Sequence, residues 1–309
     1  MKIHAIPFAL SASILLAAPL LWAESVTVPG QGEGVFTMVA KNGKEAVTPG
    51  SGQLQLRIDG KPAQVTSIEA LNSNPIELVL LIDSGLRSSI GTQLDVISDF
   101  TSELPKNTRI AVAYMQNGRA LFATPFTSDP AVARRGIHLP SGIAGINSSP
   151  YFSISDLAHN WPSRARGVRR VVVMVTDGVD PYNPRFDPDE PYLQQAITDC
   201  VRSGILVDAF FWSNRMHRRF ELSGQNMLSV ITEATGGQVW GYGFFDPVSF
   251  APYFDELRQQ LRSQYLVRFT VPLQGKPDAM NVRLKTQGLS NHLSAPGRVF
   301  VGPVPTTLQ

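Results

Sequence analysis

Two apolar runs in this sequence end in an aspartate that is followed by small or hydroxyl-bearing residues. Asp83 follows the first run in "IELVLLIDSG", and Asp177 follows the second in "VVVMVTDG". A buried strand that ends in this way delivers a carboxylate to the edge of a sheet. Ligands of open parallel sheets bind beyond the carboxyl ends of the strands. Asp83 and Asp177 are therefore the first candidates for a ligand site, and their oxygens suit a hard cation such as Mg²⁺.

The segments around these aspartates alternate between apolar strands and amphipathic helices. Near-continuous Val, Ile and Leu runs are typical of strands that are covered on both faces. The alternation predicts an α/β fold with a doubly wound, mostly parallel sheet. Asn117-Gly118 predicts a hairpin that makes one edge strand antiparallel. The predicted strands are 76–83, 108–115, 119–126, 168–178, 204–212 and 236–243, and the predicted helices are 92–104, 151–161, 191–203, 226–235 and 253–264.

Both ends of the chain carry shorter stretches in which apolar and polar residues alternate. "QLQLRIDGKPAQV" alternates in this way, and its Asp59-Gly60 predicts a hairpin turn. "YLVRFTVP" and "MNVRLKTQG" alternate near the C-terminus. We predict that segments 24–74 and 266–309 pair as a small β unit beside a central domain at 75–265.

Residues 1–23 have the features of a secretory signal peptide. One Lys precedes an apolar run from Ala5 to Trp22, and Ala23 supplies a small residue before Glu24. The run is short for a membrane-spanning helix and contains prolines; an uncleaved anchor is the alternative. We therefore expect an exported chain, periplasmic or secreted after cleavage near Ala23, that meets the membrane only through export.

Composition narrows the classes of partner. A net charge of +2 lacks the basic excess of nucleic-acid-binding proteins, so we expect no nucleic-acid partner. The basic stretches "RARGVRR" and "NRMHRRFE" are interpreted as solvated faces, although the second could contact an acidic partner or anionic lipid. Cys200 is the sole cysteine, so no intramolecular disulfide can form. Its place in an amphipathic helix predicts a small buried apolar side chain.

Sequence patterns of common enzymes are missing. G-x-S-x-G, H-E-x-x-H and phosphate-loop patterns are absent. "GQGEG" at 30–34 lacks the preceding strand and following helix of a phosphate loop. We therefore predict that the protein is not an enzyme. A hydrolase built from Ser149, Asp177 and one of the scattered histidines is the least supported reading.

The paired "LLIDSG" and "VMVTDG" strands and the order of elements resemble a von Willebrand factor type A (VWA) domain. "IDGKPAQV" before the domain and "YLVRFT" after its last helix are similar to the bacterial, acidobacterial-type branch of that family, over roughly residues 50–300. The resemblance implies a Rossmann-like fold and a metal-ion-dependent adhesion site. In that site a D-x-S-x-S loop, a Thr and a second Asp hold Mg²⁺, and the partner's carboxylate completes the metal shell.

This chain departs from that ion-binding pattern in its first loop. The loop "DSGLR" at 83–87 has Gly85 and Arg87 at the two serine positions. Ser149, or Ser148, would supply the hydroxyl of the second loop. The resemblance thus implies a degenerate site without a bound cofactor, with occupation by Mg²⁺ or Ca²⁺ as the alternative. Its metal-ligating candidates are Asp83, Ser149 and Asp177.

Arg87 leaves three arrangements open. If it turns inward, its guanidinium could replace the cation and neutralise Asp83 and Asp177. If it turns outward, Ser84 or Ser88 could reach an ion after a one-residue shift of the loop. In the third arrangement Arg87 is a solvated residue at a helix start, and Asp83 caps backbone N–H groups.

We therefore predict an exported VWA-type module for protein binding or adhesion. Its strand-end loops, at 83–90, 145–152 and 177–191, would bind a protein or a surface glycan. The alternatives are a structural scaffold of an envelope complex with a vestigial ion site, and a genuine Mg²⁺-dependent binding module. The candidate contact residues are Ser84, Ser88, Ser148, Asp180, Asp187 and Asp189.

Overall fold

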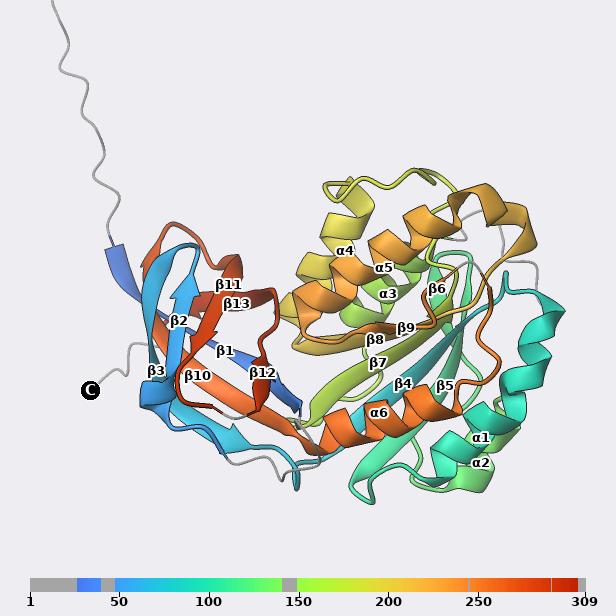
Figure 1. Ribbon diagram of the computed structural model, residues 1–309, viewed down its shortest axis with the longest axis horizontal. Coiled ribbons are helices and arrows are strands. Elements are labelled where there is room, and N and C mark those ends of the chain that lie inside the picture. The colour runs from blue at the N-terminus through green and yellow to red at the C-terminus, as the bar shows by residue number, and fades with distance from the viewer. Residues whose placement is uncertain (1–26, 40–47, 141–148, 244, 290, 305–309) are drawn as a thin grey trace, which may run out of the picture.

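The structure is a computed structural model that describes residues 27–39, 48–140, 149–243, 245–289 and 291–304. It contains an α/β domain and, beside it, a barrel of antiparallel strands (Figure 1). The predicted signal peptide and Ser148 lie outside the described residues. No helix in the described part of the chain is both long and apolar enough to cross a membrane.

The α/β domain is built on a six-stranded sheet in the order β6-β5-β4-β7-β8-β9. Neighbouring strands are parallel except β5 and β6, as predicted. Asn117 and Gly118 join this antiparallel pair with φ of 51° and 69°, the left-handed backbone that an Asn-Gly hairpin turn requires. The strands are β4 (Ile76–Asp83), β5 (Thr108–Gln116), β6 (Arg119–Phe122), β7 (Arg169–Thr176), β8 (Ile205–Phe211) and β9 (Val239–Trp240).

Helices cover both faces of this sheet, which explains the long apolar runs of its central strands β4, β7 and β8 (Figure 1). Leu78 and Leu80 of β4 belong to one hydrophobic core, and Val79 and Leu81 belong to the core on the opposite face. The first core is closed by α1 (Leu94–Ser102), α2 (Pro130–Arg135) and α6 (Ala251–Arg262). The second is closed by α3 (Pro150–His159), α4 (Pro191–Arg202) and α5 (Glu221–Thr235). Three 3₁₀ helices connect other elements, η1 (Ser51–Gln53), η2 (Ser88–Gln93) and η3 (Arg215–Phe220).

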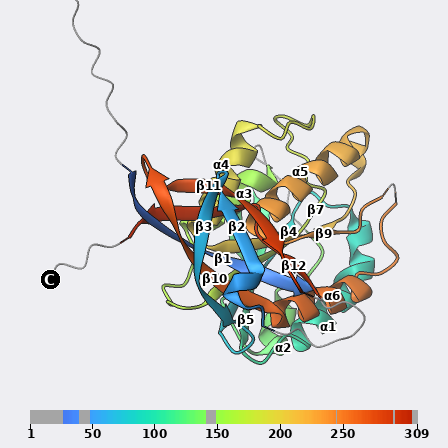
Figure 2. The same ribbon diagram turned by 60° about the vertical axis from the view of Figure 1, so that its left-hand side comes forward.

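Strands from segments 27–70 and 264–303 together form a closed six-stranded barrel (Figure 2). The prediction of a small β unit was therefore wrong, because the unit is larger than expected and closes on itself. The strand order is β10-β3-β2-β11-β13-β1, and β1 closes the barrel by pairing with β10 from Thr27↔Gln274 to Thr37↔Gln264. β12 extends the sheet beside the end of β1. The strands are β1 (Thr27–Val39), β2 (Leu54–Ile58), β3 (Lys61–Ala70), β10 (Gln264–Gln274), β11 (Asp278–Thr286), β12 (His292–Ser294) and β13 (Arg298–Pro303).

Glycines in β1 explain why the sequence concealed this closure. "GQGEG" lacks the apolar alternation of an ordinary strand, yet Gly30 and Gly32 lie against the barrel interior. A Cβ on Gly32 would stand 2.6 Å from the ring of Phe269, and a Cβ on Gly30 would stand 2.7 Å from Cβ of Leu273. The barrel interior is therefore filled by side chains of β10 at the positions where β1 has none.

Two local predictions have mixed outcomes, and one helix was not predicted. The hairpin at Asp59-Gly60 is confirmed, because both residues adopt positive φ, of 45° and 77°, between β2 and β3. The strand predicted at 236–243 is reduced to β9. Helix α2 was not predicted; it begins where the carboxylate of Asp129 accepts a hydrogen bond from the N–H of Ala131 at 2.9 Å.

The sheet places the candidate site on the side of the α/β domain that faces away from the barrel. The parallel strands begin beside the barrel and end at the opposite edge (Figure 1). From β4 the chain adds β5 on one side and later β7 on the other, so winding reverses between β4 and β7. Asp83 ends β4 and Asp177 follows β7, and both therefore lie at this switch point, where such sheets bind ligands.

Candidate functional site

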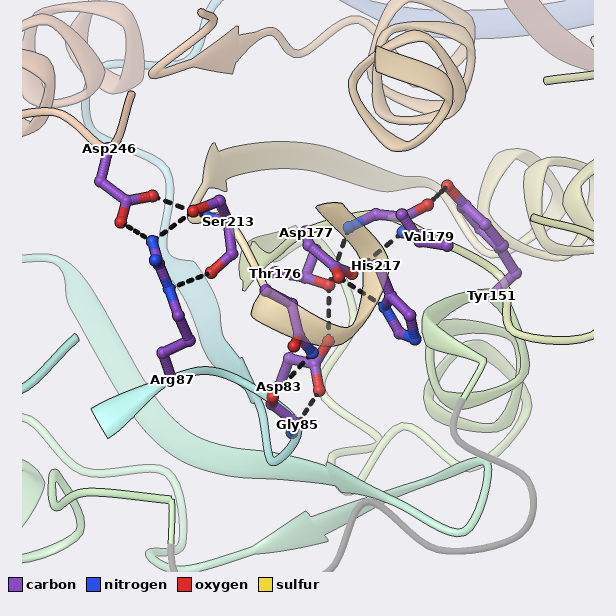
Figure 3. A network of polar contacts seen from close by, with 12 residues as sticks. Asp83, Gly85, Arg87, Tyr151, Thr176, Asp177, Val179, Ser213, His217 and Asp246 are labelled. Atoms are coloured by element: carbon purple, nitrogen blue, oxygen red, sulfur yellow. Dashed lines mark hydrogen bonds and ion pairs between the residues drawn. The ribbon is translucent and has the colours of Figure 1, made fainter. Parts of the chain in front are cut away.

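Asp83 and Asp177 come together at the end of the sheet, as their places in the sequence predicted (Figure 3). They end neighbouring strands that pair in register up to Ile82↔Val175. Both are buried, with 6% of Asp83 and 1% of Asp177 exposed. Two carboxylates this close need compensation by hydrogen bonds or positive charge.

Neutral groups hold the carboxylate of Asp83. Its Oδ1 accepts a hydrogen bond from the N–H of Gly85 at 2.7 Å, and its Oδ2 accepts one from the hydroxyl of Thr176 at 2.8 Å. The hydroxyl oxygen of Thr176 in turn accepts from the N–H of Gly178 at 3.1 Å. The predicted capping of backbone N–H groups by Asp83 is thus present, although only Gly85 donates directly.

A histidine compensates Asp177. Nδ1 of His217 lies 2.7 Å from Oδ2 of Asp177, while Oδ1 of Asp177 accepts a hydrogen bond from the N–H of Val179 at 3.0 Å (Figure 3). His217 lies in η3, which follows β8, and 26% of its side chain is exposed. The imidazole therefore closes the site from its solvent side.

The surroundings raise the pKa values of both Asp83 and His217. Burial raises the pKa of Asp83 from 3.8 to about 6, and the charge of Asp177 adds to that rise. The hydrogen bond to Asp177 raises the pKa of His217 above 6.5, against the opposing effect of partial burial. The contact with Asp177 therefore favours the protonated form of His217.

Arg87 lies at a helix start, before η2, as in the third arrangement, but its guanidinium is bound by other residues of the chain instead of being solvated. Its Nε donates a hydrogen bond to the carbonyl of Ser213 at 3.0 Å. Its Nη2 contacts the hydroxyl of Ser213 and the carboxylate of Asp246, and Asp246 also accepts from the N–H of Ser213 at 2.9 Å (Figure 3). Arg87 thus turns away from Asp83 and ties the first loop to the segments after β8 and β9.

Ser149 lies in the interior at the start of α3. Its hydroxyl is fully buried and has no hydrogen-bond partner among the described residues. Oδ2 of Asp180, which is also fully buried, lacks a partner in the same part of the chain, although Oδ1 accepts from the N–H of Tyr182 at 2.9 Å. Burial raises the pKa of Asp180, and the nearby Ser149 hydroxyl opposes that rise.

The candidate contact residues divide between surface and interior. Ser88, Asp187 and Asp189 are exposed, so they are available to a partner. Ser84 is only 8% exposed, and Asp180 is enclosed. The exposed candidates therefore come from the start of η2 and from the segment between β7 and α4.

The residues present do not fit the octahedral magnesium site that the VWA resemblance implies. The hydrogen bond between His217 and Asp177 leaves no room for an ion between them, and both oxygens of Asp83 accept hydrogen bonds from the chain. Gly85 and Arg87 supply no hydroxyl. Within the described residues, no group of three or more His, Cys, Asp and Glu side chains has the arrangement of a metal site.

His217 is a residue of the candidate site that the sequence analysis did not identify. It was read as part of the basic stretch "NRMHRRFE", interpreted as a solvated face. The available signal was its position, because this stretch follows β8, which neighbours β7 in the sheet. Any loop that follows β8 lies near the switch point, so a basic side chain in this stretch can reach a buried carboxylate there.

An Asp–His pair is also part of hydrolytic triads, so the geometry bears on the hydrolase reading. Such a triad needs a hydroxyl or thiol that hydrogen-bonds the second imidazole nitrogen. Among the described residues, no hydrogen bond to Nε2 of His217 is present, and the hydroxyl of Ser149 has no partner.

Comparison with known proteins finds likeness in structure alone. No family model matches the chain, and no curated protein matches it in sequence. Among solved structures, it is similar to an aerotolerance-related membrane protein from Bacteroides fragilis, with 17% identity, coverage of 60% of this chain and 98% of that chain, and a TM-score of 0.45. It is similar to a von Willebrand factor type A protein from Catenulispora acidiphila, with 13% identity, coverage of 90% of this chain and 74% of that chain, and a TM-score of 0.41. The vWF domain of a type V pili tip protein from Porphyromonas gingivalis matches at 12% identity, with coverage of 60% of this chain and 94% of that chain and a TM-score of 0.43.

Proposed function

We propose that this chain is an exported binding module that recognises a protein or surface-glycan ligand through its strand-end face, without a divalent ion. His217 supplies the positive charge that a metal supplies in the adhesion site of VWA domains. An acidic group of the ligand would bind this imidazolium. The proposal includes export, for which the apolar N-terminal segment 1–23 is the support.

The pairing of His217 with Asp177 carries the proposal. Its side chain is 26% exposed, and its Nε2 makes no hydrogen bond to the described residues, so one N–H of the imidazolium can donate to a ligand. The raised pKa of His217 favours this charged form. A ligand carboxylate at Nε2 would therefore form a charge-assisted hydrogen bond beside the switch point.

Apolar side chains on the flanking loops give a ligand further area to contact. Tyr182 and Phe186, between β7 and α4, are 50% and 41% exposed, and Tyr192, in the first turn of α4, is 48% exposed. After β9, Phe245 and Val248 are 87% and 99% exposed. Exposed aromatic residues beside a charged group are common in protein- and glycan-binding surfaces.

The test is a peptide and glycan array probed with the mature protein, followed by affinity measurement for the strongest ligand. We expect equal binding in Mg²⁺ and in EDTA, and weaker binding at about pH 8.5 than at about pH 6, because the imidazolium is lost as pH rises through its pKa. His217→Gln should lose at least about tenfold in affinity, and His217→Arg should retain part of it. Asp278→Asn in the barrel is the control.

The proposal fails if binding requires Mg²⁺ or Mn²⁺, or if His217→Gln binds with unchanged affinity and unchanged pH dependence. A requirement for metal would support the ion-dependent module instead. Unchanged binding by His217→Gln with full sensitivity to changes at Phe245 would place the contact on the loop after β9 alone.

A further inference from the structure

A cleft of about 460 Å³ lies between the barrel and the α/β domain. Its walls include the starts of β7 and β8 from the α/β domain and residues of β1, β10 and β13 from the barrel. β7 has eight residues and runs from this cleft to the strand-end site, a length of about 26 Å at about 3.3 Å per residue. The cleft is therefore separate from the site around His217.

Arg169, at the start of β7, is a buried cation in the wall of this cleft, and only 7% of it is exposed. Its guanidinium donates to neutral acceptors, the carbonyl of Leu261 at 2.8 Å, Oε1 of Gln264 at 2.6 Å and the carbonyl of Asn74 at 3.4 Å. Its Nε has no partner, and no carboxylate in the described part of the chain forms an ion pair with it. Burial lowers its pKa from 12.5 to about 10. A buried charge without a counter-ion is costly, so this side chain favours an anion nearby.

The other arginines of the cleft strengthen this imbalance. The lining contains five arginines and two glutamates. Both glutamates, Glu33 and Glu69, pair with Arg268. Arg298 donates to Oε1 of Gln194 at 2.7 Å, and neither it nor Arg166 or Arg170 forms an ion pair with a described carboxylate. Positive charge therefore remains in excess in the cleft.

The rest of the lining is largely apolar. Leu71, Val201, Leu206, Leu266 and Phe300 contribute to the walls. Ligand sites in proteins typically combine an apolar cleft of this size with a few polar groups that fix orientation, and they occur preferentially between domains. Guanidinium groups bind carboxylate and phosphate with two parallel hydrogen bonds.

We propose that this cleft binds a small organic anion, with a carboxylate or phosphate group held by Arg298 and Arg166 and further attracted by the buried charge of Arg169, and an apolar body against the walls.

A purely structural role for Arg169 explains less of the arrangement. The carbonyl of Leu261 belongs to the last turn of α6, where the helix dipole favours a cation. The bond to Gln264 ties β7 to the start of β10. Together with the bond from Nη2 to the carbonyl of Asn74, these contacts account for both terminal nitrogens of the guanidinium. They do not account for the unpartnered Nε or for the three further arginines without carboxylate partners.

The test uses the mature protein and four probes: acetate, octanoate, inorganic phosphate and octyl phosphate. Binding is measured by calorimetry and by the shift in melting temperature, with sodium chloride at matched ionic strength as the blank. We expect octanoate or octyl phosphate to bind and raise the melting temperature, at least about tenfold more tightly than the head group alone. The tighter of the two identifies the head group.

Variants of Arg166 and Arg298 test whether the anion binds in the cleft, and they leave the buried Arg169 in place. Arg298→Gln and Arg166→Gln should each weaken binding about tenfold and together abolish it, whereas Arg283→Gln on the exposed face of β11 should bind as the wild type does. Circular dichroism verifies that each variant is folded. The proposal is overturned if neither octyl probe binds above the salt blank, or if the Arg166/Arg298 double variant binds with wild-type affinity.

Discussion

Replacing Asp83 with Asn should stabilise this protein at alkaline pH, the opposite of what a metal ligand would do. The carboxylate is buried and accepts hydrogen bonds from Gly85 and Thr176. In Asp83→Asn the amide oxygen can keep the bond to Gly85, and the amide N–H₂ can donate to the hydroxyl of Thr176 after that hydroxyl rotates. The substitution therefore removes the charge while retaining the shape of the loop.

The expected magnitude follows from the pKa of Asp83. Below pH 3.8 the carboxyl is protonated in both folded and unfolded states, so its charge costs nothing. Between 3.8 and about 6 the folded state holds a proton that the unfolded state releases, and stability falls as pH rises. Above about pH 6 the carboxylate is ionised in both states, and its burial then lowers the free energy of unfolding by about 3 kcal/mol, the free energy that corresponds to this difference in pKa. Loss of one charge-assisted hydrogen bond offsets about 1 kcal/mol, which leaves a net gain of about 1–2 kcal/mol for Asn.

Urea unfolding of the wild type and Asp83→Asn at about pH 4 and about pH 8, with EDTA present, measures this gain. The difference should be largest at the higher pH and should vanish or change sign at the lower one. Asp187→Asn, at an exposed position, is the matched control and should change stability little at either pH. If Asp83→Asn were less stable than the wild type at pH 8, the carboxylate would be compensated there, and the pairing of His217 with Asp177 would not describe the charge balance of the site.

Three further predictions follow from the same contacts. His217→Gln should lower the free energy of unfolding by about 1–3 kcal/mol at about pH 6, because it removes the cation beside Asp177. The loss should be smaller at about pH 9, where the wild-type imidazole has lost its proton. Equal losses in urea unfolding at both pH values would contradict this. Arg87→Met should cost about 1 kcal/mol and speed hydrogen exchange around Asp246, because its guanidinium ties two loops together; exchange at the wild-type rate would show that it does not. Cys200 is fully buried with a raised pKa, so a thiol reagent should modify it only as fast as the protein unfolds, and rapid modification of the native protein would refute its burial.

Local patterns in the sequence determined the α/β half of this protein. Apolar runs such as 76–83 predicted buried parallel strands, and Asn117-Gly118 and Asp59-Gly60 predicted turns, because strand burial and positive φ depend on residues within a few positions of one another. The same runs placed Asp83 and Asp177 at strand ends. The barrel was underestimated because Gly30 and Gly32 interrupt the apolar alternation of β1, and their role depends on Phe269 far along the chain.

The chemistry of the site was decided only by tertiary structure. The resemblance implied that Gly85 and Arg87 stand at two hydroxyl positions. The sequence did not indicate where the guanidinium of Arg87 lies, because its partners Ser213 and Asp246 are 126 and 159 residues away. His217 reaches Asp177 across 40 residues because β8 happens to neighbour β7 in the sheet. Residue type and spacing fix which charges must be buried at a strand end; the packing of distant loops fixes which cation compensates them.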